Sequence, residues 1–281
     1  MGSPNGVHAA LSADWLSASR RAAEAARRAL AGYPEYADRA RETGRGEGGD
    51  MTLAIDRAVE DTVLAELRSF GVGVTVVTEE RGVLDVAGGG PARVLLDPID
   101  GSLNAKRGLR PYALSLAVAS GDTMADVEFG YVADLPGGEE WWALHGQGAF
   151  HDGAPLRLPG GSRLELLAVE SARPELVADA GAALIATEAR RLRMIGSIAL
   201  SLCFVASGGV DAMVSLRPCR SIDAAAGQLI VREAGGTVVF PDAGDGRLGA
   251  GLDLDMRSRV VAAPTTETLD RLGALALAHS G

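Results

Sequence analysis

The 281-residue chain has little positive charge and no long apolar run. It contains 27 Lys and Arg residues against 37 Asp and Glu residues, which leaves a formal net charge of −10. A chain this acidic is a poor general binder of nucleic acid or anionic membrane, because both attract basic surfaces. It lacks a run of about 18 apolar residues, so we expect no segment to cross a bilayer. Nucleic acid and membrane are therefore not expected as partners.

Lysine, cysteine and aromatic residues are also scarce. Lys106 is the only lysine, and aromatic side chains make up 4% of the chain, so we expect a core of Ala, Val, Leu and Ile. Cys203 and Cys219 do not form a Cys-x-x-Cys pair, and we expect reduced thiols in a cytoplasmic protein. Residues 1–10 show no basic segment followed by an apolar one, so no secretory signal is predicted.

Hydrophobic periodicity predicts an α+β first half and an α/β second half, packed together without a long linker. We place the division between residues 154 and 155, giving parts 1–154 and 155–281. Helices are predicted over residues 11–30, 54–70, 198–206 and 224–233, and from 174 and 265 onward. Strands are predicted over residues 74–77, 93–96, 112–119, 127–132, 141–144, 166–170, 192–195, 210–215, 237–240 and 260–263. Residues 43–49 and 145–153 are glycine-rich and predict a loop and turns.

The strongest local signal is the segment Asp97-Pro98-Ile99-Asp100-Gly101-Ser102-Leu103-Asn104. An apolar strand precedes this segment, and we expect the segment to form a tight turn. Two carboxylates three residues apart then lie at the carboxyl end of a strand, where α/β active sites form. The N–H groups of Gly101 and Ser102 would make a nest that suits phosphate oxygens. Taken alone, such a pair of aspartates is more often part of a turn or a cap.

Three further acidic sites can likewise be interpreted either as functional residues or as ordinary loop and cap residues. Glu79 and Glu80 follow a predicted strand, and alone they indicate a solvated loop. Asp223 stands at the start of a predicted helix, where a plain N-cap contributes about 1 kcal/mol. Asp50 and Asp56 flank the start of another helix, which is again an ordinary place for aspartate. Their combination is what carries information.

Three motifs occur together in the order and spacing of one family. The segments are TEE (78–80), DPIDGSLN (97–104) and IDAAAGQLIVREAGG (222–236). The chain resembles the inositol monophosphatase family, which belongs to the lithium-sensitive, metal-dependent sugar-phosphatase superfamily that includes fructose-1,6-bisphosphatases. The resemblance extends over about residues 49–264 through GDMTLAIDRAVED (49–61), HGQGAF (145–150) and RMIGSIALSLCFVASGGVDA (193–212). It implies a layered αβαβα sandwich with the site in the cleft between two halves.

The resemblance also implies a metal site. Each like-charged carboxylate pair at ~4 Å repels by ~4 kcal/mol at an effective dielectric near 20, so a converging cluster requires cations. Oxygen ligands without Cys or His favour Mg²⁺, with Mn²⁺ as a substitute. We expect two or three ions. The family pattern assigns the ligands to Glu79, Asp97, the carbonyl of Ile99, Asp100 and Asp223, most of them in the first half of the chain.

The implied reaction is hydrolysis of a phosphate monoester by metal-activated water, which attacks the phosphorus in line. Ser102 stands where the family has a threonine and pairs with Asp56 to activate the water. Glu80 matches an acidic position that orients that water. Substrate contacts fall on Gly101, Ser102, Gly196, Ser197 and Arg217. For Gly196 and Ser197 a plain helix N-cap is an equal alternative.

Several residues depart from the family pattern without removing a metal ligand. Thr78 replaces a glycine, Ile222 replaces a tryptophan, and residues 44–49 replace a segment that often carries a lysine. Leu216 stands where inositol-selective members have an acid, and Arg217 and Arg220 flank it. An arginine fork suits a second phosphate better than a hydroxyl, although pairing with surface acids is an equal alternative.

These residues make fructose 1,6-bisphosphate the lead substrate and inositol 1-phosphate the second. The alternatives are a 3′-phosphoadenosine 5′-phosphate or NADP phosphatase of the same family, and an inactive member that acts as a regulator. Lys106 lies on the loop of the predicted phosphate nest, where it either raises the local positive potential or simply faces solvent. By resemblance we expect a homodimer that binds a small phosphorylated sugar or polyol.

Overall fold

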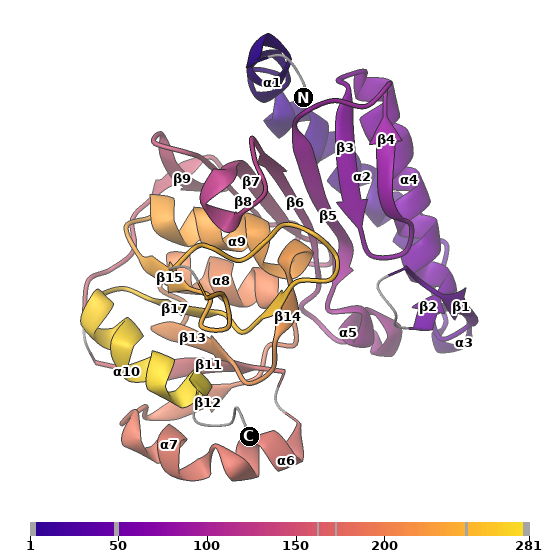
Figure 1. Cartoon of the computed structure of the whole chain (residues 1–281). Helices are drawn as coiled ribbons and strands as arrows, with labels where there is room; N and C mark the ends of the chain where they lie inside the picture. Colours follow the sequence, from indigo (N-terminus) through magenta and orange to yellow (C-terminus); the bar gives the residue numbers. More distant parts are fainter. Residues whose placement is uncertain (1–3, 48–50, 162, 172, 245–246, 278–281) are drawn as a thin grey trace.

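The structure is a computed structural model that describes residues 4–47, 51–161, 163–171, 173–244 and 247–277. Two β-sheets alternate with three helical layers (Figure 1). The larger sheet has the strand order β10-β9-β8-β7-β6-β5-β3-β4. Its strands are β3 (Val74–Thr78), β4 (Gly82–Val86), β5 (Arg93–Asp100), β6 (Ala113–Ala119), β7 (Val127–Asp134), β8 (Glu140–Leu144), β9 (Gly148–His151) and β10 (Ala154–Leu156). Within it, β3 and β5 are parallel and the other pairs are antiparallel.

The smaller sheet has the order β12-β11-β13-β17-β15. Strand β11 runs parallel to both of its neighbours, as expected where helices connect strands, and β17 is antiparallel to its two. Its strands are β11 (Leu166–Glu170), β12 (Arg191–Arg193), β13 (Ala212–Ser215), β15 (Thr237–Val239) and β17 (Val261–Ala263). Two short ribbons complete the strands: β1 (Glu42–Arg45) with β2 (Met51–Leu53), and β14 (Cys219–Arg220) with β16 (Arg257–Ser258).

Helices cover both faces of each sheet. On the outer face of the large sheet lie α2 (Trp15–Ala31) and α4 (Ala54–Phe70), and between the sheets lie α8 (Ile198–Ala206) and α9 (Ser221–Glu233). Helix α10 (Thr266–Leu277) packs on the far face of the small sheet. The order is therefore αβαβα, as the resemblance implies. The remaining helices are α1 (Pro4–Leu11), α3 (Tyr36–Arg39), α5 (Ser102–Arg107), η1 (Met124–Asp126), α6 (Pro174–Asp179) and α7 (Gly181–Ala186).

The largest core cluster lies between the two sheets and is built mainly from small aliphatic residues. Close packing of α9 depends on glycine: a Cβ at Gly130 of β7 would lie 2.7 Å from the carbonyl oxygen of Ala226. A Cβ at Gly227 would likewise lie 2.7 Å from Leu202 of α8. The scarcity of aromatic residues thus matches a core in which helices approach closely.

Some predicted elements agree with the structure and some do not. The predicted bounds of 54–70 and 166–170 are those of α4 and β11. The single helix predicted over 11–30 is wrong, because α1 ends at Leu11 and Asp14 caps α2 by accepting from the N–H of Ser17. Residues 43–45 of the loop predicted over 43–49 belong to β1, and its last two residues fall outside the described ones. The turns predicted over 145–153 contain β9.

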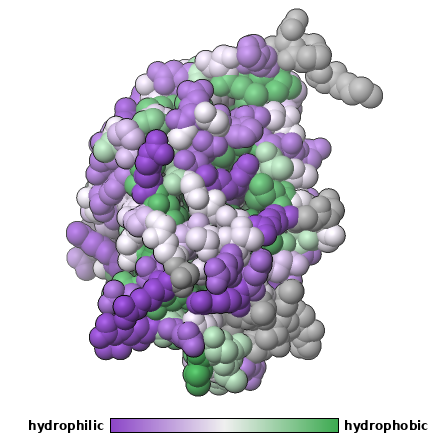
Figure 2. Space-filling view, turned by 90° about the vertical axis from the view of Figure 1, so that its left-hand side faces the viewer, coloured by the Kyte–Doolittle hydropathy of each residue, from purple (hydrophilic) through white to green (hydrophobic). Residues whose placement is uncertain are grey.

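Hydrophobic residues on the face shown in Figure 2 occur as separate patches among hydrophilic ones. None of the described helices is both long enough and apolar enough to span a membrane.

Candidate active site

The carboxyl end of β5 carries the first two acidic residues of the site. The strand continues to Asp100, beyond its predicted end at Leu96, so the predicted turn begins only at Gly101. Pairing with β6 shifts register between Asp97 and Asp100, and this bulge turns both side chains toward one cavity. Gly101 then adopts a left-handed conformation with φ 96° and begins α5. Its missing side chain matters, because a Cβ there would lie 3.0 Å from the carbonyl oxygen of Gly196.

An acidic cavity of about 420 Å³ collects the predicted carboxylates from four elements. Asp56 comes from α4, Glu79 and Glu80 follow β3, Asp97 and Asp100 end β5, and Asp223 lies in the first turn of α9. The other lining residues are Glu42, Met51, Leu53, Ile99, Gly101, Ser102, Leu103, Lys106, Gly196 and Arg220. Every predicted metal and catalytic residue therefore lines one cavity. Lys106 lies on its wall, and Asp50 falls outside the described residues.

Burial and mutual repulsion make these carboxyls hard to ionise. Burial raises the pKa of Asp56 to about 7, and the charge of Glu80 adds to the effect. Burial also raises the pKa of Asp223 to about 7, with a further contribution from Asp100. Asp97, which is buried beside Asp100, has a pKa well above its ordinary value. A group of carboxyls that must be ionised together in this cavity needs a compensating cation.

Asp100 is held at the start of α8. Its Oδ2 accepts from the hydroxyl of Ser197 at 2.5 Å and from the N–H of Ala199 at 2.6 Å. Burial raises the pKa of Asp100 to about 7, and these two hydrogen bonds act in the opposite direction. Ser197 is also the N-cap of α8, because its Oγ accepts from the N–H of Leu200. Both interpretations of Ser197, cap and site residue, therefore fit the structure.

The donor set fits a hard divalent cation. The cavity offers carboxylate oxygens and the Ile99 backbone, and its described lining contains neither Cys nor His. Oδ1 of Asp56 is buried and has no hydrogen-bond partner among the described residues. A separate group, Glu139, His151 and Asp152, has ligand atoms within 4.8 Å of one another but includes none of the predicted residues.

The predicted pairing of Ser102 with Asp56 is not present as a hydrogen bond. The Ser102 hydroxyl donates to the carbonyl oxygen of Ile99 at 3.0 Å. Oδ2 of Asp56 accepts from the N–H of Leu53 at 3.2 Å. Glu80 has its own partner, since the buried hydroxyl of Thr52 donates to its Oε2. Ser102 and Asp56 thus line the same cavity without a hydrogen bond between them.

Glu60 supports the segment that carries Glu79 and Glu80, and sequence reasoning missed it. Its fully buried carboxylate accepts from the hydroxyl of Thr78 at 2.7 Å and from the N–H of Glu80 at 3.3 Å. The departure at position 78 thereby has a structural role, because glycine offers no hydroxyl. The only signal in the sequence was an acidic residue on the apolar side of a predicted helix, four residues after Asp56.

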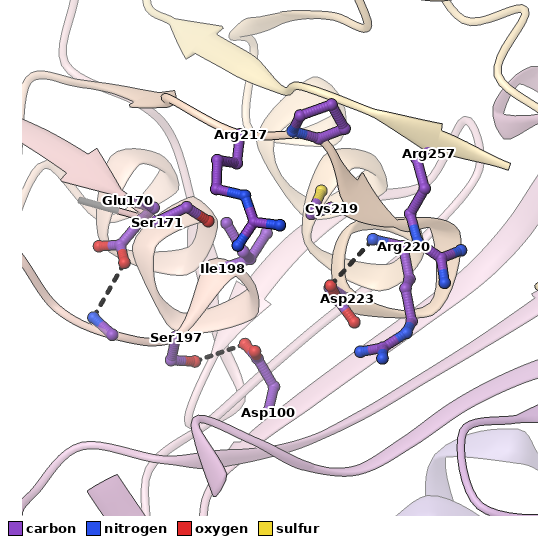
Figure 3. Close-up of a pocket in the computed structure, with 12 residues that line it drawn as sticks. Asp100, Glu170, Ser171, Ser197, Ile198, Arg217, Cys219, Arg220, Asp223 and Arg257 are labelled. Carbon is purple, nitrogen blue, oxygen red and sulfur yellow. Dashed lines mark hydrogen bonds between the residues drawn. The ribbon is translucent and has the colours of Figure 1, made fainter. Parts of the chain in front are cut away.

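A second cavity, of about 500 Å³, adjoins the acidic one, and we call it the arginine cavity (Figure 3). Asp100, Gly196, Arg220 and Asp223 line both cavities. Its other lining residues are Glu170, Ser171, Ser197, Ile198, Arg217, Pro218, Cys219 and Arg257. Three guanidinium groups thus stand beside the carboxylate cluster.

The arginine cavity contains residues that the sequence did not reveal. Leu216 is 5% exposed and packs in the core below the small sheet, so the exposed Arg217 is what lines the cavity. Arg257 was missed, because its place follows from the pairing of β16 with β14, where it lies opposite Arg220. Glu170 was missed too: it ends β11 and accepts from the N–H groups of Ile195 and Gly196, each at 2.9 Å.

Comparisons with known proteins agree with this architecture. A family model described as the inositol monophosphatase family matches residues 12–280. A fructose-1,6-bisphosphatase/inositol-1-monophosphatase of Archaeoglobus fulgidus is 37% identical over 253 residues, which cover 89% of this chain and 93% of that protein. The Nus factor SuhB of Haemophilus influenzae is 32% identical over 252 residues, which cover 88% and 92%. A solved structure of an IMPase of Thermotoga maritima has a TM-score of 0.73 at 26% identity, covering 93% of this chain and 98% of that one. The chain belongs to the metal-dependent inositol monophosphatase family and is a hydrolase of phosphate monoesters.

Proposed function

We propose that this phosphatase uses Mg²⁺ and acts on small sugar or polyol phosphates, with a preference for substrates that carry a second phosphate. Fructose 1,6-bisphosphate is the lead substrate, and inositol 1-phosphate is the second. The observation that carries this proposal is the junction of the two cavities: a cluster of buried carboxylates and a set of three arginines share one wall. One phosphate would lie at the acidic cavity while the other lies among the arginines.

The metal-holding residues in this proposal are those of the family pattern. Glu79, Asp97, Asp100, Asp223 and the carbonyl of Ile99 would hold two or three Mg²⁺ ions, for which Mn²⁺ would substitute. When bound, the ions supply charge neutralisation for the phosphate and lower the pKa of water. These ions also reverse the sign of the local charge, which lets an acidic protein accept an anionic substrate.

The chain's own groups handle the proton and the phosphate. Oδ1 of Asp56 is buried and has no hydrogen-bond partner within the described part of the chain, and burial raises the pKa of this carboxyl to about 7. Such a group suits uptake of a proton at neutral pH. Ser102 lines the same cavity and would relay that proton once its hydroxyl turns from the carbonyl oxygen of Ile99 to Asp56. Glu80 would orient the attacking water. The N–H groups of Gly101 and Ser102 would bind the phosphate, and Lys106 would add positive charge.

Residues around the arginine cavity would set the substrate preference. Arg217, Gly196 and Ser197 all line the cavity, and Ser197 lies across it from Arg217 (Figure 3). A planar guanidinium binds two phosphate oxygens at once, whereas a ring hydroxyl would be bound better by a carboxylate. Position 216 holds a leucine that is buried in the core, so this position places no carboxylate in the cavity. We further propose that the protein acts as a homodimer and keep the division at residue 154 as a prediction.

The test compares two substrates in one variant. Arg217→Ala is expected to lower kcat/KM for fructose 1,6-bisphosphate about 10- to 100-fold, since hydrogen bonds to charged groups contribute about 1.5–3 kcal/mol. The value for inositol 1-phosphate should change less than threefold. Arg190→Ala is the matched control, because Arg190 is exposed and pairs with Glu165 away from both cavities. Equal kcat/KM values for fructose 1,6-bisphosphate in wild type and Arg217→Ala would refute the proposal.

The same assay separates the competing functions. A panel that includes 3′-phosphoadenosine 5′-phosphate and NADP identifies a nucleotide-directed enzyme by its larger kcat/KM on those compounds. Phosphate release that requires Mg²⁺ excludes an inactive regulator. Loss of activity in EDTA with recovery on adding Mg²⁺ is the expected result.

A further inference from the structure

Arg220 belongs to both cavities and is bound to two of the proposed metal-holding residues. Its backbone N–H donates to Oδ2 of Asp223 at 3.0 Å. Its Nη1 lies 3.0 Å from Oε1 of Glu79, and the two side chains are only 15% and 17% exposed. A partly buried guanidinium is thus paired with a carboxylate that the proposed function gives to a metal ion.

These two uses of Glu79 compete. A guanidinium stays protonated at any physiological pH, so a divalent cation at Glu79 would meet a fixed positive charge at contact distance. In a partly buried site, water screens that repulsion poorly. Arg220 also lines the arginine cavity, where Arg217 and Arg257 already stand (Figure 3). Because the side chain of Arg220 is flexible, its guanidinium can move from Glu79 into the arginine cavity without leaving the site.

We propose that Arg220 is the internal counter-cation of the metal-free enzyme and that its guanidinium leaves Glu79 for the arginine cavity when a divalent ion binds. The proposal rests on the metal site of the proposed function. It means that metal binding strengthens the arginine cavity, because a third guanidinium then becomes available to an anionic substrate. Metal and phosphorylated substrate are consequently coupled through one side chain, and the metal-loaded enzyme binds the substrate more tightly.

The test measures binding of Mn²⁺ alone, without substrate or turnover. EDTA-treated protein is titrated with Mn²⁺, and free Mn²⁺ is followed by electron paramagnetic resonance. Arg220→Met keeps the length of the side chain and removes its charge. Because the competing cation is gone, we expect this variant to bind Mn²⁺ about tenfold more tightly than wild type, the effect of one charge-assisted hydrogen bond.

The matched control is Arg217→Met, which lies in the same cavity and is expected to bind Mn²⁺ within twofold of wild type. Unchanged or weaker Mn²⁺ binding by Arg220→Met overturns the role of Arg220. If the wild type fails to bind Mn²⁺, or Asp97→Asn binds it as well as wild type does, the metal site of the proposed function itself fails.

A second measurement needs no variant. In a crystal structure of the Mn²⁺-loaded wild type, the guanidinium of Arg220 is expected beyond hydrogen-bond distance of Glu79 and inside the arginine cavity. A guanidinium that still pairs with Glu79 in the loaded protein overturns the displacement. This result stands even if Arg220→Met fails to fold.

Discussion

The acidic cavity and the arginine cavity are neighbours of similar volume that differ in charge: carboxylates far outnumber cations in the first, whereas three arginines balance Asp100, Glu170 and Asp223 in the second. In the acidic cavity the charged groups are short, mostly buried, and fixed by backbone hydrogen bonds, as Asp97 is by the N–H of Ile99 at 3.0 Å. In the arginine cavity the positive groups are carried on long side chains, and Arg217 is exposed. The fixed carboxylates suit a precise metal coordination geometry, and the long arginine side chains suit substrates whose second anionic group varies. We infer that the acidic cavity carries the chemistry and that the arginine cavity determines substrate specificity.

The largest effect should come from Asp100, which lines both cavities. Asp100→Asn keeps the size of the side chain but removes its charge, so the proposed metal site loses an anionic ligand. We expect kcat/KM at saturating Mg²⁺ to fall by about three orders of magnitude, corresponding to the several kcal/mol that metal ions contribute in such reactions. The control is Asp122→Asn, because Asp122 is 78% exposed and pairs with Arg93 outside both cavities. Wild-type kcat/KM in Asp100→Asn would remove Asp100 from the metal site.

The contrast in burial should also appear in the pH dependence of stability. The pKa of Asp56, Asp100 and Asp223 is about 7, against an ordinary value of 3.8. Between these values the folded, metal-free protein holds more protons than the unfolded chain, so its free energy of unfolding falls as pH rises. For one such carboxyl acting alone the full loss is roughly 4 kcal/mol.

Thermal unfolding checks this sign. In EDTA we expect the Tm to fall by roughly 5–10 °C from pH 5 to pH 8. Saturating Mg²⁺ should reduce or reverse that fall, because it binds the ionised carboxylates of the folded state. A metal-free Tm that rises over this range would show that the acidic cavity does not hold its carboxyls in the protonated form.

The sequence predicted the acidic cavity far better than the arginine cavity, for a physical reason. Asp97, Asp100 and Asp223 lie in motifs whose order and spacing resemble the inositol monophosphatase family, and that resemblance implied that β5 and α9 bring them together. Arg257 reaches the site through a two-residue strand pairing that joins distant segments, and such pairing leaves no local periodicity. The helix break at Asp14 was missed because apolar spacing continues across it, and only the capping hydrogen bond shows where α2 begins. Elements with a continuous pattern, such as α4, were predicted to the residue.

The smallest expected effect concerns Thr52, a residue with a 3% exposed fraction that lies behind Glu80 of the acidic cavity. Its hydroxyl donates to Oε2 of Glu80, and Thr52→Val removes the hydroxyl while preserving the shape. We expect kcat to fall roughly 3- to 10-fold, the range of one neutral hydrogen bond, with KM for the substrate unchanged because Thr52 does not line the arginine cavity.

The same substitution at Thr62 separates this role from stability. Thr62 donates to the carbonyl oxygen of Ala58 within α4, so Thr62→Val tests the loss of a threonine hydroxyl away from Glu80. If Thr52 positions Glu80, Thr52→Val should lower kcat at temperatures where both variants are fully folded, and Thr62→Val should not. Equal kcat in the two variants would assign Thr52 to stability alone. Catalytic precision would then rest on the backbone-fixed aspartates rather than on the surrounding hydroxyl groups.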